Sequence, residues 1–119
     1  MQIHVHTSNG MENKETLERW ADAQIRHLLG HWVQELTRVE VHLSDESRDA
    51  KSAPDKRCAL EARVPHHAPV AVSRHATTVD EALRGAADKL KRALDSMLGR
   101  RGDQRDRESI RKDTSAAIE

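Results

Sequence analysis

Hydrophobic and polar residues alternate in four separate stretches of the chain, and this alternation predicts four β-strands that each bury one face. The predicted strands cover residues 1–6, 36–43, 58–64 and 70–76. The fourth is the weakest, because Ala71 and Ser73 add little to its pattern. A turn at 65–69 precedes it. The polar segment 44–57 contains a proline, and we expect it to be a long mobile hairpin connection.

Two other stretches carry apolar residues at every third or fourth position, the spacing of a helix with one buried stripe. They cover residues 13–30 and 78–102. Thr78, followed three residues later by Glu81, predicts a capping box at the start of the second helix. Gly99 and Gly102 predict its end.

Residues 103–119 mix charges of both signs without a sustained apolar stripe. We therefore expect one folded domain over 1–102 and a disordered C-terminal tail over 103–119.

The predicted order of elements is β-α-β-β-β-α, an α+β fold. A right-handed crossover would make the first two strands parallel, and the last three strands would form an antiparallel meander. We expect a four-stranded mixed sheet with both helices on one face, an arrangement similar to a double-stranded-RNA-binding domain. The other face would stay exposed, with these outward residues: His4, His6, Arg38, His42, Glu61 and Arg63.

Composition limits the classes of function. The 119 residues include 20 basic and 20 acidic ones, so attraction to a polyanion must come from a local group of cations. The aromatic residues are two tryptophans, which excludes a platform for stacking bases. Cys58 cannot form an internal disulfide, and no apolar run is long enough for a signal peptide or a membrane span. We expect a cytoplasmic protein without a membrane partner.

The second helix carries the least balanced positive charge. Lys89 and Arg92 lie one turn apart on a flank with no acid in line, although Asp88 can reach Arg92. The opposite flank is expected to neutralise itself through two i, i+4 pairs, Arg84 with Asp88 and Lys91 with Asp95. A flank of this kind either recruits phosphates or is only a solvated surface.

Catalytic and metal-binding patterns are weak. The chain has no glycine-rich phosphate loop and no nucleophile elbow, and Cys58 falls on the apolar side of a strand. We expect no enzyme activity, no cofactor and no small-molecule substrate. His27 and His31, and the adjacent His66 and His67, raise a metal hypothesis, but no carboxylate lies at a third-ligand spacing, so no metal site is predicted.

Three stretches resemble a known family. The pattern LxxWxxxxIxxLxxxW over 17–32, the strand VEVHL at 39–43 and above all AADKLKRAL at 86–94 resemble the ribosome hibernation promoting factors and ribosome-associated inhibitors, also called sigma-modulation proteins. The resemblance covers about residues 1–99. It implies the β-α-β-β-β-α fold and a non-catalytic protein. Such a protein binds small-subunit rRNA in the channel for messenger and transfer RNA and inhibits translation under stress.

The resemblance also implies a set of binding residues. Lys89 and Arg92 match the basic pair of the family's second helix, whereas Gln24 and His27 replace lysines usual in its first helix, which predicts weaker and less salt-dependent binding. Asp95 to Leu98 likewise replace a lysine run. We predict a groove between the two helices in which their cations face each other. The predicted RNA-binding residues are Lys89, Arg92, Arg100, Arg101, Arg19, Arg26 and His27.

Two alternatives remain open from the sequence. The same fold could serve as a protein-interaction adaptor that grips a regulatory protein through the exposed sheet face or the 44–57 connection. It could also bind double-stranded RNA generally, since the order of strands and helices is similar.

Overall fold

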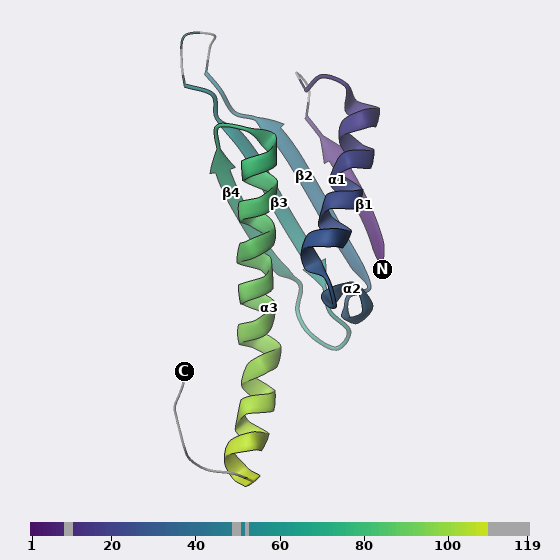
Figure 1. Ribbon diagram of the computed structural model, residues 1–119, viewed down its shortest axis with the longest axis vertical. Coiled ribbons are helices and arrows are strands. Elements are labelled where there is room, and N and C mark those ends of the chain that lie inside the picture. Colours follow the sequence, from purple (N-terminus) through teal and green to yellow (C-terminus); the bar gives the residue numbers. More distant parts are fainter. Residues whose placement is uncertain (9–10, 49–50, 52, 110–119) are drawn as a thin grey trace.

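The structure, a computed structural model, describes residues 1–8, 11–48, 51 and 53–109, and the side chains as far as residue 98. Its elements follow the predicted order, with one short helix added after the first long one (Figure 1). The elements are β1 (Gln2–Thr7), α1 (Lys14–Leu29), α2 (Trp32–Glu35), β2 (Arg38–Asp45), β3 (Lys56–Arg63), β4 (Val70–Ala76) and α3 (Val79–Ser109).

The four strands form one mixed sheet in the order β1-β2-β3-β4. β1 pairs with β2 in parallel, and the other two pairings are antiparallel. Both long helices cover the same face of this sheet (Figure 1). The predicted α+β fold and its mixed sheet are therefore confirmed. β1 and β4 form the two opposite edges of the sheet. A helix side chain that points past the edge of the sheet therefore lies next to β1 or next to β4.

The core fills the space between the helices and the sheet. α1 contributes Ala21, Ile25 and Leu29, each at most 1% exposed. α3 and the strands supply the remaining fully buried large side chains, Leu43, Leu60, Leu83, Leu90, Leu94, Val39, Val41 and Cys58. Burial of this apolar surface is the main stabilising contribution to the fold. It also fixes the rotation of each helix about its own axis.

The predicted end of the last helix is wrong. α3 continues through Gly99 and Gly102 as far as Ser109. Glycine in a helix costs about 1 kcal/mol relative to alanine, which does not by itself end a helix. Residues 103–109, expected to belong to a disordered tail, are therefore helical. Residues 110–119 lie outside the described residues, and the domain boundary at 102 stays a prediction.

The connection between β2 and β3 is shorter than predicted. β2 extends to Asp45 and β3 begins at Lys56. The Lys56 ammonium donates to the Asp45 carboxylate at 2.8 Å, and the backbone N–H of Glu46 donates to the carbonyl of Asp55 at 2.7 Å. The backbone bond continues the ladder into the segment expected to be mobile, and the side-chain ion pair joins the ends of the two strands there.

Candidate nucleic-acid interface

The start of α3 determines which way its cations point. The backbone N–H of Glu81 donates to the Thr78 hydroxyl at 3.1 Å, and that hydroxyl donates to the Glu81 carboxylate, also at 3.1 Å. The first half of the predicted capping box, the bond from the Glu81 backbone N–H to Thr78, is confirmed, whereas the Glu81 carboxylate accepts from the Thr78 hydroxyl and not from its backbone N–H. From this start, the buried stripe of α3 faces β3 and β4. The flank that carries Lys89 then reaches β4.

Lys89 lies at the β4 edge of the sheet. Its ammonium donates to the backbone carbonyl of Ser73, in β4, at 2.9 Å. A carbonyl oxygen fixes the position of the ammonium without neutralising it, and an ammonium has two further N–H groups to donate. Lys89 therefore presents a full positive charge at a defined place.

Arg92 forms an ion pair with Asp88 at 3.0 Å, with side chains that are 79% and 56% exposed. Exposed i, i+4 pairs are worth only about 0.3–0.5 kcal/mol, so a phosphate can take the place of Asp88. The predicted pairing of Asp88 with Arg84 is wrong, because Arg84 donates instead to Asp80 at 3.0 Å.

Lys91 was expected to pair with Asp95. No ion pair joins the two among the residues that the structure describes. The flank expected to be neutral is thus only partly so.

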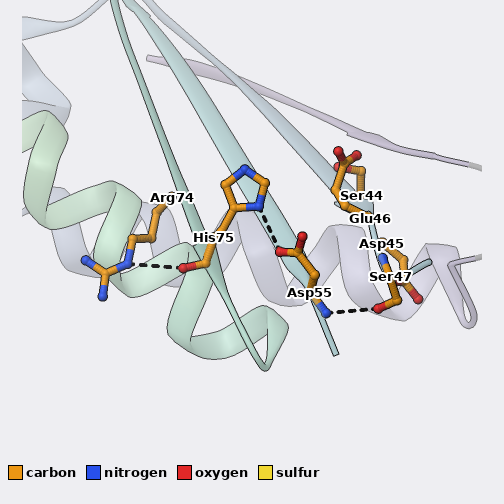
Figure 2. A network of polar contacts seen from close by, with 7 residues as sticks. All are labelled: Ser44, Asp45, Glu46, Ser47, Asp55, Arg74 and His75. Carbon is orange, nitrogen blue, oxygen red and sulfur yellow. Dashed lines mark hydrogen bonds and ion pairs between the residues drawn. The ribbon is translucent and has the colours of Figure 1, made fainter. Parts of the chain in front are cut away.

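Arg74 is a third cation at this edge, and the sequence analysis missed it. It occupies a helix-side position of β4, in register with buried Cys58. Its side chain packs on Gly85 of α3, where an added β-carbon would lie 2.8 Å from Cγ of Arg74. Its Nε donates to the carbonyl of His75 at 3.3 Å, as Figure 2 shows. Gly85 is one turn before Lys89, so Arg74 lies beside the lysine.

We call Arg74, Lys89 and Arg92 the basic edge. Among the described residues, Arg92 is the only one of the three with an acidic partner. A glycine within a helical pattern signals a close approach by a neighbouring chain segment, and Gly85 was the available clue. The pattern alone does not say which side chain approaches.

The cations of α1 lie at the other edge of the sheet. Arg26 pairs with Asp22 at 2.8 Å and donates to the carbonyl of Met1 at 3.5 Å. Arg19 lines a hollow on the β1 side of α1, together with Ile3, Val5, Glu15, Glu18, Asp22 and Ala23. The prediction that these cations face Lys89 across a groove is wrong, because α1 turns them toward β1 while α3 turns Lys89 toward β4.

The remaining predicted residues are His27, Arg100 and Arg101. His27 is exposed and, within the described part of the chain, forms no hydrogen bond. Arg100 and Arg101 belong to the helical backbone of α3, and their side chains lie outside the described residues.

On the helix-free face of the sheet, Glu40 is the centre of a polar cluster. Only 9% of this residue is exposed, although it points away from the helices. His6 donates to one of its oxygens at 2.7 Å, and Arg38 pairs with the other. The hydrogen bond from His6 and the charge of Arg38 lower the pKa of Glu40 in spite of its burial.

Comparisons with known proteins agree with this fold. Residues 3–101 match the family model described as sigma 54 modulation protein / S30EA ribosomal protein. A ribosomal subunit interface protein from Coxiella burnetii superposes with a TM-score of 0.65 at 12% identity, covering 83% of this chain and 99% of that one. The N-terminal domain of Protein Y from Thermus thermophilus superposes with a TM-score of 0.62 at 17% identity, covering 82% of this chain and 99% of that one. No curated protein sequence matches.

Proposed function

Since the chain belongs to the sigma 54 modulation and S30EA ribosomal protein family, a family of ribosome-associated modulation factors, we propose that it binds rRNA of the small subunit in the channel used by messenger and transfer RNA. Bound there, it blocks translation by occupying the site of its substrates. The protein then acts in the cytoplasm as a hibernation factor and not as a catalyst.

The basic edge carries this proposal. Lys89 is held by the carbonyl of Ser73 and Arg74 by its packing on Gly85, on two elements that pack against each other, and Arg92 follows Lys89 by about one turn of α3. Cations held in place lose less side-chain entropy on binding than free ones do. Guanidinium and ammonium groups donate to phosphate oxygens, and each neutralised phosphate releases counterions. Structured RNA is recognised largely through such contacts and through its shape.

Arg100 and Arg101 follow Arg92 along α3, and we propose that they extend the same contact. Arg19, Arg26 and His27 belong to α1 and not to the basic edge. Their contact with RNA remains a prediction, now for a second and separate surface. Replacing Arg19 and Arg26 by glutamate tests that surface on its own.

Co-sedimentation with purified small subunits, at low and moderate salt, tests the proposal. The test variant is Lys89→Glu/Arg92→Glu. Its matched control, Arg84→Glu/Lys91→Glu, makes the same change of charge on the same helix but on the other flank. We expect the test variant to lose at least about tenfold in affinity at moderate salt, and the control to lose much less.

Equal losses in the two variants would mean that only overall charge matters, which contradicts a specific basic edge. No association of the unmodified protein with small subunits, together with its recovery in a complex with a single protein in ribosome-free fractions, would favour the adaptor function.

A further inference from the structure

The helix-free face of the sheet carries a cluster that the sequence did not predict. His6 of β1 and Glu40 and His42 of β2 each offer one ligand atom, and these atoms all lie within 4.8 Å of one another. No other group of three metal-ligating side chains lies so close together among the residues that the structure describes. This face is opposite to the one that α1 and α3 cover (Figure 1).

Strand register brings the three side chains together. His6 is paired directly with His42 across the parallel β1–β2 ladder, and Glu40 is two residues before His42 on the same face. The two imidazole rings stack with centroids 4.7 Å apart and an interplanar angle of 14°. Successive outward positions of adjacent strands are therefore occupied by two imidazoles and one carboxylate.

We propose that His6, Glu40 and His42 form a binding site for a Zn²⁺-class divalent transition-metal ion. Two imidazoles and one carboxylate, with a coordination position open to water, are a donor set that zinc accepts. Mg²⁺ and Ca²⁺ favour oxygen ligands instead, so the two imidazoles select against them.

The ligand atoms must shift to hold the ion: Nε2 of His6 and Oε1 of Glu40 would move apart, and the ligand atoms that lie up to 4.8 Å apart would come closer. Ligand atoms at about 2.0–2.1 Å from a tetrahedral zinc lie about 3.3 Å from one another. Nε2 of His6 and Oε1 of Glu40 are 2.7 Å apart, joined by the hydrogen bond whose proton a metal ion would displace into solvent. His6 is half exposed, with 52% of its side chain accessible, so its ring has room to turn.

Arg38 is compatible with this role. It pairs with Oε2 of Glu40, whereas His6 contacts Oε1. The arginine therefore orients the carboxylate from behind and leaves Oε1 for an ion. Residues that hold a ligand in this way commonly affect metal affinity tenfold or more.

Titration of the full chain with Zn²⁺ after removal of metals by EDTA tests the site. We expect one Zn²⁺ ion to bind tightly per chain. When Co²⁺ replaces Zn²⁺, the visible absorption spectrum should be that of a four-coordinate Co²⁺ ion. His6→Gln and His42→Gln should each weaken binding at least about tenfold. The matched control is His4→Gln, a histidine of the same strand and face that lies outside the cluster.

Metal-free variants should first show unchanged circular dichroism and thermal unfolding. If a variant does not fold, the ring ¹⁵N resonances of the unmodified protein serve instead, and Zn²⁺ should shift those of His6 and His42 first. Failure of Zn²⁺ to bind overturns the proposal, as does binding that His4→Gln weakens as much as His42→Gln does. Neither outcome bears on the ribosomal proposal, because the cluster and the basic edge share no residue.

Discussion

Arg74 lies across Gly85, so close that a β-carbon on the glycine would be 2.8 Å from Cγ of the arginine. Cγ is near the backbone of Arg74 and cannot move far without a change of rotamer. A glycine near the start of α3 is thus the reason that a cation of β4 can lie beside Lys89. Glycine makes the helix less stable at this position than alanine would, but it leaves the space that the Arg74 side chain occupies.

Gly85→Ala is expected to displace Arg74 and weaken binding to small subunits as much as Arg74→Ala does. The free energy of unfolding should change little, because the gain in helix propensity, about 1 kcal/mol, is offset by the crowding. In an Arg74→Ala background the same substitution should stabilise the protein by about that amount. Urea unfolding of the four proteins provides the measurement. If Gly85→Ala stabilises the protein by the same amount when Arg74 is present, the position of the arginine does not depend on the glycine.

Thr78→Ala should destabilise the protein by about 1 kcal/mol, since it removes the acceptor for the Glu81 backbone N–H at the start of α3. Thr77→Ala is the matched control. The Thr77 hydroxyl donates only to the Glu81 carboxylate, at 2.8 Å, so its loss should cost less. Thermal unfolding compares the two. If Thr77→Ala proves the more damaging, the cap does not hold the helix start.

The pairing of Asp45 with Lys56 should make stability depend on pH. The hydrogen bond from Lys56, and those from Ser47, lower the pKa of Asp45 strongly. A lowered folded-state pKa stabilises the protein fully above the unfolded-state value of about 3.9, and this contribution is lost as pH falls further.

Asp45→Asn should therefore lower the urea midpoint at pH 7, with a difference from the unmodified protein that shrinks progressively between pH 4 and pH 2. Asp95→Asn is the control, because Asp95 forms no ion pair with Lys91 among the described residues. A difference for Asp45→Asn that stays constant with pH would contradict the role of the ion pair.

Cys58 should resist thiol reagents while the protein is folded. Burial raises the pKa of its thiol to about 12, so almost no thiolate exists at pH 8, and the side chain is inaccessible. Its reaction with a thiol-specific disulfide reagent should be slow in buffer and fast in denaturant. Equal rates under the two conditions would show that β3 opens readily.

Periodicity was sufficient to predict the architecture. Residues such as Ile25, Leu83 and Leu90 repeat at helical spacing and are buried, and the alternation along 39–43 places Val39 and Val41 in the core. Side-chain pairing was harder to predict. Arg84 can reach an acid four residues before or after it, and the choice of Asp80 depends on rotamers that spacing does not specify.

Contacts between strands could not be predicted from the pattern. Alternation assigns His6 and His42 to the same face, but their pairing depends on the register of β1 against β2. The position of Arg74 over Gly85 likewise depends on how β4 and α3 are placed together. The side of each helix on which its cations emerge follows from the rotation that core packing imposes.

The salt dependence of binding to small subunits tests the role of the basic edge most directly. Each lost phosphate contact should reduce the slope of log K against log salt concentration by about 0.7–0.9. Arg74→Gln/Lys89→Gln should therefore reduce the slope by about 1.5, whereas Arg84→Gln/Lys91→Gln should leave it nearly unchanged. Identical slopes for the unmodified protein and Arg74→Gln/Lys89→Gln would contradict the account.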